Sequence, residues 1–187
     1  PAILADEVVG EVSTKLFADA KEMLKQIEDE KWLTHKGVVG LFPASSVGDD
    51  IHIYDPENAS ELLMVQHSIR QQSKKAAGVP NIALSDFIAP RETGVVDYVG
   101  GFVVTSGIGI DDKVEAFEAD HDDYNSILLK ALADRLAEAF AEYLHKKVRT
   151  DLWGYAQDEG LGNEELIKEK YRGIRPAPGY PACPDHT

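Results

Sequence analysis

The sequence predicts an α+β domain, because two long helical patterns flank a region of short strand patterns. In residues 6–31 and 124–148, apolar side chains recur every three or four positions, which is typical of amphipathic helices. Between them, residues 35–105 hold short apolar or alternating runs separated by turn residues, as in antiparallel strands. Strands that are grouped in sequence favour the α+β class over a fold in which strands and helices alternate. A length of 187 residues fits one domain.

The first helix is predicted over residues 6–31. Lys, Glu and Asp occupy one face, and the other face is apolar, with Val8, Val9, Val12, Leu16, Phe17, Ala20, Met23, Leu24 and Ile27. Its start is the weakest part, because Gly10 in a helix interior costs about 1 kcal/mol relative to Ala.

Two strands are predicted before residue 55. The apolar run Val38–Phe42 is consistent with a buried strand that Pro43 ends. Residues 51–54, with the sequence Ile-His-Ile-Tyr, alternate apolar and polar side chains, which predicts a half-exposed strand.

A turn at residues 55–58 predicts a hairpin. Its proline fixes one backbone angle and its asparagine tolerates unusual ones, so the chain reverses easily there. Residues 62–69 are compatible with a helix or a strand, and the preceding turn favours the second strand of the hairpin. Residues 82–88 and 95–105 predict two further strands.

Helical patterns return after residue 110. A short helix is predicted over residues 111–119, and the longest helix over residues 124–148. The apolar stripe of the long helix consists of Leu128, Leu129, Leu132, Leu136, Ala139, Phe140 and Tyr143. Asn163 is the expected N-cap of another short helix, and Glu164 and Glu165 are favourably placed near its positive end.

Composition excludes several classes of partner. The chain carries 33 acidic and 19 basic residues, a net charge of −14, which argues against binding to nucleic acids or anionic membranes. No run approaches the roughly 18 apolar residues of a membrane span, and the first residues do not form a signal peptide. We therefore expect a cytoplasmic protein. The single cysteine, Cys183, excludes an internal disulfide and a Cys-rich zinc site.

Three short motifs are compatible with chemistry but favour structural roles. Gly107–Gly109 follows a predicted strand, yet the third glycine and the βαβ alternation of a nucleotide site are missing, so a turn is favoured. The His-Asp-Asp sequence at residues 121–123 precedes a helix and is expected to cap it. Cys183 and His186 are too close in an extended loop to form a convincing nucleophile–base pair. We predict no catalytic residue and no metal site in this chain.

Glu142 and His145 share the spacing of metal ligands in di-iron bundles. Such bundles need two copies of this step and two further glutamates, and the sequence supplies one copy. A solvated helix stripe that also includes Asp134 and Glu138 is favoured. A metal-dependent helical enzyme built on this pair remains an alternative, which bound metal would support.

The last sixteen residues, 172–187, differ from the rest because they hold four prolines. Such a segment cannot form a helix or a central strand. Arg175 offers planar donors that suit a carboxylate, Gly179 allows close approach to the backbone, and Tyr180 adds an aromatic face. These residues suit a zwitterionic, partly aromatic small molecule. The alternative is a Pro-rich crossover in which Arg175 pairs with a local acid.

The Arg175-Pro-Ala-Pro-Gly179-Tyr180 segment matches an Arg-x-x-x-Gly-Tyr signature. With it, the sequence resembles the activation domain of cobalamin-dependent methionine synthase along nearly its whole length. The other segments that carry this resemblance are Pro1–Leu4, Ile69–Gln72, Leu84–Pro90, His121–Tyr124, Ala131–Phe140 and Asn163–Leu166.

The resemblance implies a C-shaped single domain over residues 1–187, with a bent antiparallel sheet flanked by helices. Such a domain binds S-adenosylmethionine and supports the reductive methylation of cob(II)alamin to methylcobalamin in methionine biosynthesis. It is part of a methyltransferase, 5-methyltetrahydrofolate–homocysteine methyltransferase, whose cobalamin and zinc are held by other domains. The implied partners are the cobalamin-binding domain of the same enzyme and flavodoxin or a flavoprotein reductase. A fragment of this kind is not expected to turn over alone.

The resemblance also assigns ligand-binding residues. Arg175 would hold the methionyl carboxylate, Ala177 and Gly179 would line the pocket with their backbone, and Tyr180 would pack near the sulfonium. Glu138 would face the loop and complement the positive charge of the sulfonium or amino group.

Glu169 matches a family position near the contact with the cobalamin-binding domain. Family members also extend beyond both ends of this sequence, so we expect a domain truncated at both ends with an incomplete pocket. The alternative function is therefore a docking or scaffold module that contacts the cobalamin-binding domain without binding ligand.

Overall fold

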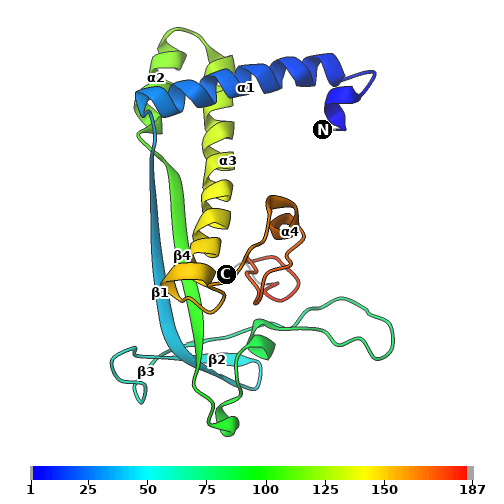
Figure 1. Ribbon diagram of the computed structural model, residues 1–187, viewed down its shortest axis with the longest axis vertical. Helices are drawn as coiled ribbons and strands as arrows, with labels where there is room; N and C mark the ends of the chain where they lie inside the picture. Colours follow the sequence, from blue (N-terminus) through cyan, green and yellow to red (C-terminus); the bar gives the residue numbers. More distant parts are fainter. Residues whose placement is uncertain (1, 185–187) are drawn as a thin grey trace. The chain divides into compact units, whose positions relative to one another are not determined.

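A computed structural model describes residues 2–184. Helices precede and follow a four-stranded sheet, so the predicted α+β class is confirmed (Figure 1). Two compact units form the chain. Within the described residues, unit 1 covers 2–38 and 103–146, and unit 2 covers 39–102 and 147–184. Among these residues no helix is both long and apolar enough to cross a membrane.

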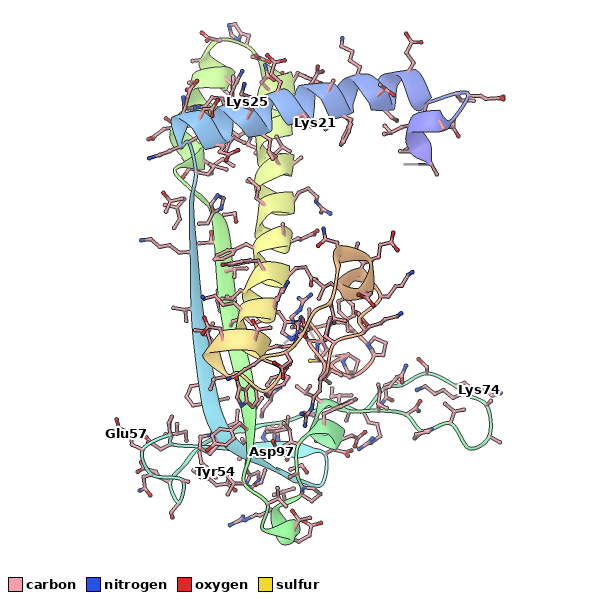
Figure 2. The ribbon with its side chains drawn as sticks, viewed as in Figure 1. Lys21, Lys25, Tyr54, Glu57, Lys74 and Asp97 are labelled. Carbon is pink, nitrogen blue, oxygen red and sulfur yellow. The ribbon has the colours of Figure 1, made fainter. Side chains whose placement is uncertain are left out.

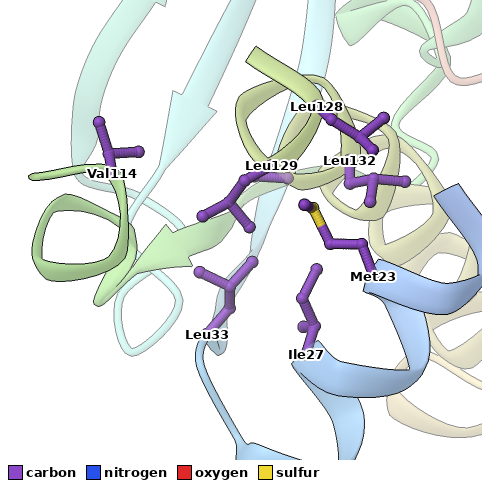
Figure 3. Close-up of a cluster of buried hydrophobic side chains, with 8 residues drawn as sticks. Met23, Ile27, Leu33, Val114, Leu128, Leu129 and Leu132 are labelled. Atoms are coloured by element: carbon purple, nitrogen blue, oxygen red, sulfur yellow. The ribbon is translucent and has the colours of Figure 1, made fainter. Parts of the chain in front are cut away.

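Three helices build the core of unit 1. They are α1 (Gly10–Glu30), α2 (Ile110–Ala119) and α3 (Asp123–Lys147). Figure 3 shows side chains of α1 and α3 that face one another across this core. The buried cluster consists of Met23, Ile27, Leu33, Val114, Leu128, Leu129, Leu132 and Ala133. The apolar stripe predicted for the long helix therefore contributes three of its leucines to this core.

Aspartate side chains precede the starts of α1 and α3 and accept backbone hydrogen bonds there. The carboxylate of Asp6 accepts hydrogen bonds from the backbone of Val8 and Val9, and α1 starts at Gly10 rather than at residue 6. Before α3, the Asp122 carboxylate accepts a 3.1 Å bond from the backbone N–H of Asn125. The capping role predicted for residues 121–123 is thus confirmed.

The sheet has the order β3-β2-β1-β4. Its strands are β1 (Thr34–Val47), β2 (Asp50–Tyr54), β3 (Leu62–Gln66) and β4 (Asp97–Ile108). β1 and β2 pair in antiparallel register from Ala44 with Ile53 to Val47 with Asp50, and β3 continues the sheet antiparallel to β2. The predicted hairpin of residues 51–54 and 62–69 is confirmed, although β3 ends at Gln66.

Two strand predictions were wrong. Pro43 does not end the first strand, because β1 runs through it to Val47. Pro43 immediately precedes the first residue that pairs with β2, so its missing N–H removes no bond from that ladder. Residues 82–88 contain a 3₁₀-helix, η2 (Leu84–Phe87), and no strand. The Asp86 carboxylate accepts a 2.9 Å bond from the backbone of Ala83, which closes the turn locally.

The remaining elements follow the strands. Two short 3₁₀-helices are η1 (Ile3–Ala5) and η3 (Arg91–Thr93), and α3 continues into a π-helical turn, η4 (Val148–Leu152). The helix predicted at Asn163 is α4 (Asn163–Ile167). Its N-cap is Gly162 rather than Asn163, because Glu165 reaches back to accept a 3.1 Å bond from the Gly162 backbone.

We expect Leu129→Ala to lower the free energy of unfolding by about 2–5 kcal/mol, because a fully buried leucine (0% exposed) leaves a cavity in unit 1. Urea denaturation followed by circular dichroism measures this change. Ile127→Ala on the same helix is the matched control, since Ile127 is 66% exposed. Equal destabilisation by the two substitutions would contradict this core assignment.

Candidate functional site

The candidate site is the loop that follows α4, which we call the C-terminal loop (residues 174–184). It contains no helix and no strand longer than an isolated bridge between Tyr180 and Cys183. Arg175 and Pro176 are half-buried, and Ala182 is buried. The loop is therefore anchored at both ends while its middle is exposed.

A tight turn forms the exposed middle. The backbone N–H of Tyr180 donates a 3.1 Å bond to the carbonyl of Ala177. Gly179 has a φ of 93°, and a proline precedes it, which are the features of a type II turn. A side chain at residue 179 would be strained at this angle, so glycine is required by the backbone.

A second turn closes the loop on the first. Cys183 donates from its backbone to the carbonyl of Tyr180 over 2.9 Å, and Gly179 donates to the carbonyl of Cys183 over 2.8 Å. The backbone shape of this segment is thus fixed by its own hydrogen bonds. The predicted pre-ordered, non-regular loop matches this geometry.

The side chains predicted from the resemblance occupy both units. Arg175, Ala177, Gly179 and Tyr180 lie together in the C-terminal loop of unit 2, where Tyr180 is 58% exposed. Glu138 lies on α3 in unit 1, where its exposed carboxylate accepts a 2.8 Å contact from Arg135.

Glu169 lies just after α4 in unit 2. It has a left-handed backbone with a φ of 53°, and its N–H donates to the carbonyl of Leu166 over 3.0 Å. Its side chain is exposed, which leaves the carboxylate accessible to a partner.

Glu142 and His145 differ in burial. Glu142 is exposed together with Asp134 and Glu138, whereas His145 is buried, so the prediction of a solvated stripe was wrong for the histidine. Within residues 2–184, no three His, Cys, Asp or Glu side chains are grouped closely enough to hold a metal ion. His186, considered above as a partner of Cys183, lies outside the described residues.

A buried ion pair precedes the C-terminal loop in the sequence and was missed by the sequence analysis. Nε and Nη2 of Arg149 donate to the two carboxylate oxygens of Glu159 over 2.8 and 2.6 Å. The Tyr171 ring lies 4.3 Å from the guanidinium. No sequence signal marks this pair, because its members are ten positions apart and both residue types are usually exposed.

Comparisons with known proteins identify the family of this chain. The family model described as "Vitamin B12 dependent methionine synthase, activation domain" matches residues 1–187. The chain belongs to this family. It is also similar to a crystal structure of the MetH reactivation domain bound to AdoHcy, with 59% sequence identity and a TM-score of 0.89. The match covers 100% of this chain and 57% of the length of that chain.

Another polar cluster of this activation-domain chain lies near the start of the loop between β3 and η2. Arg70 donates to both carboxylate oxygens of Asp86 and to Asp49. Hydrogen bonds from Arg70 and from the Ala83 backbone hold the pKa of Asp86 below its ordinary value. Figure 2 shows Lys74 at the outer end of this loop. The cluster thus fixes the base of the loop.

Tyr155 of this family member also has a shifted pKa. Burial raises the pKa of the phenol above its usual 10, because the charged phenolate is poorly solvated there. Its hydroxyl donates to the carbonyl of Arg172 over 3.3 Å. A raised pKa contributes stability that is present below about pH 10 and is lost as the pH rises through the folded-state pKa.

We therefore expect Tyr155→Phe to make the fall of the melting temperature above pH 10 shallower than in the wild type. Thermal unfolding between pH 8 and about 11.5 measures the slope, a range set by the ordinary tyrosine pKa. Tyr143→Phe, which removes a hydroxyl from an exposed ring, controls for the substitution. An unchanged slope in Tyr155→Phe would show that Tyr155 does not contribute to alkaline unfolding.

Proposed function

We propose that this chain binds S-adenosylmethionine and serves as the reactivation module of a cobalamin-dependent methionine synthase. One observation carries this proposal: the chain is 59% identical over its whole length to a reactivation domain that was crystallised with AdoHcy. AdoHcy is the product that remains when S-adenosylmethionine has given up its methyl group. The whole enzyme would be the methyltransferase that forms methionine, and residues 1–187 would act in it as one domain.

The C-terminal loop fits the carboxylate end of such a ligand. Arg175 supplies a guanidinium, whose fork of donors can bind both oxygens of a carboxylate. The turn at Ala177–Tyr180 presents backbone close to the ligand, because Gly179 has no side chain there. Since the turn is closed by its own hydrogen bonds, little conformational entropy is lost when a ligand binds.

The ligand also carries positive charge, on its central sulfonium and on the amino group beside the carboxylate. When bound, it supplies the methyl group of that sulfonium. Glu138 is an exposed carboxylate that complements this charge or that of the amino group, and the exposed ring of Tyr180 offers an aromatic face to a cation. The protein thereby orients the ligand, while no side chain of the chain is assigned a covalent step.

The function also requires partners. We propose that the cobalamin-binding domain of the same enzyme docks near Glu169, and that flavodoxin or a flavoprotein reductase donates the electron of reductive methylation. Cobalamin and zinc would be held by other domains of the enzyme. A cytoplasmic location is part of this proposal, as is the absence of nucleic-acid and membrane partners, in accord with a net charge of −14.

Arg175→Ala is expected to weaken S-adenosylmethionine binding by about 1.5–3 kcal/mol, the contribution of a hydrogen bond to a charged group. Isothermal titration calorimetry of the full chain measures the dissociation constant. Arg91→Ala, at an exposed arginine of η3, is the matched control and should bind as the wild type does. An unchanged affinity in Arg175→Ala would remove this residue from the site. If the wild type itself stays silent, the docking module without ligand becomes the function to test.

Glu138→Gln is expected to weaken S-adenosylmethionine binding by several-fold, because it removes a negative charge that complements the sulfonium or amino group. Glu142→Gln on the same helix changes the same type of side chain and serves as the control. The same calorimetric titration measures both. Equal dissociation constants for the two variants would exclude a specific role for Glu138.

A further inference from the structure

The charged side chain of Arg149 is buried in the protein interior. It lies in η4, directly after α3, and only 1% of its side chain is exposed, with 5% for its partner Glu159. Two parallel hydrogen bonds join the guanidinium to this carboxylate. A bidentate pair of this kind allows one orientation of the guanidinium plane. The plane of Arg149 is therefore fixed by Glu159.

The fixed guanidinium lies against the segment that leads into the C-terminal loop. The ring of Tyr171 lies 4.3 Å from the Arg149 guanidinium. The next residue, Arg172, accepts the hydrogen bond of Tyr155 through its carbonyl. Gly173 then turns the chain with a φ of 89°, and a Cβ there would lie 3.1 Å from the Tyr155 hydroxyl. Residues 171–173 thus contact the side chains of Arg149 and Tyr155.

We infer that Arg149 is a positioning residue for the ligand-binding loop. Arg149 and Glu159, together with Tyr171, form a clasp that sets the direction in which the chain leaves Gly173. Arg175 follows two residues later, a span of at most about 7 Å. A displacement of the clasped segment is therefore transmitted to the guanidinium of Arg175. This inference rests on the proposed function, because the clasp matters for ligand only if the loop binds one.

The burial of charge supports a geometric role for the clasp. A buried ion pair contributes little net stability compared with apolar side chains of the same size, because both charges lose their hydration. The pair does fix the orientation of the guanidinium, since its two hydrogen bonds are satisfied in one geometry. The ring of Tyr171 packs on the face of the oriented guanidinium, so the orientation of Arg149 determines where the ring lies.

Tyr171→Leu and Tyr171→Phe form the decisive pair of variants. Leucine removes the ring but leaves the Arg149–Glu159 pair intact, whereas phenylalanine keeps the ring and loses only the hydroxyl. Titration of S-adenosylmethionine should show about tenfold weaker binding for Tyr171→Leu, the scale of a buried cation–π contact, and near wild-type binding for Tyr171→Phe. Tyr143→Leu, at an exposed tyrosine of α3, is the control for loss of an aromatic ring.

Hydrogen exchange of the free protein gives a readout that needs no ligand. The amides of Gly179, Tyr180 and Cys183 donate the bonds that close the loop. They should exchange at least about fivefold faster in Tyr171→Leu than in the wild type or in Tyr171→Phe, while amides of the sheet keep their rates, because only the loop is released.

Each outcome decides one question. Unchanged exchange of the loop amides in Tyr171→Leu overturns the clasp, whether or not ligand binds. Faster exchange throughout unit 2 would show a merely structural role and also overturns it, as would faster loop exchange with unchanged affinity. A wild-type chain that fails to bind S-adenosylmethionine overturns the proposed function instead, and the exchange rates still decide whether Tyr171 orders the loop.

Discussion

The burial of the Arg149 guanidinium constrains the C-terminal half of unit 2. A guanidinium that is removed from water requires an oppositely charged partner. Glu159 is this partner, and its carboxylate accepts two hydrogen bonds from Arg149. The chain between these residues must then return to the end of α3, which accounts for the compact turns after η4, where Ala156 donates to the carbonyl of Arg149 over 2.9 Å. The position of the following segment depends on this closure.

The C-terminal loop shows a different solution to the problem of an irregular segment. Its backbone cannot use a helix or a sheet, because proline recurs at every second or third position. Two consecutive turns satisfy the donors and acceptors instead, with glycine at the one position where the backbone angle is positive. Rigidity and exposure therefore coexist in the same few residues, a combination that suits recognition of a small molecule.

The fold class was predictable because the helical and strand patterns are long and lie in separate parts of the sequence. The local predictions that were wrong concern segments whose structure depends on contacts with distant residues or on side chains that bond to nearby backbone. Residues 82–88 carry a strand-like composition, yet Asp86 closes a 3₁₀ turn on Ala83 and is held by Arg70, far away in sequence. Pro43 was tolerated because of the strand register, which a single sequence does not reveal.

For the site, the turn-forming residues were predictable, since proline and glycine act through their own backbone. The buried polar side chains were not. His145 lies near the end of α3 and Arg149 in the turn that continues it, and only the packed structure shows that both are buried. The apolar period identifies the faces of a helix, but it does not reveal a charged residue that is compensated by another one ten positions later.

The order of the sheet has a consequence for how copies of the chain behave toward each other. β4 is an edge strand of twelve residues, and Val103 on it is 72% exposed. A long edge of this kind is a template on which another strand can pair. The net charge of −14 makes copies of the chain repel one another and so opposes such pairing. This repulsion weakens as salt is added, because salt shortens its range to about 8 Å at physiological ionic strength.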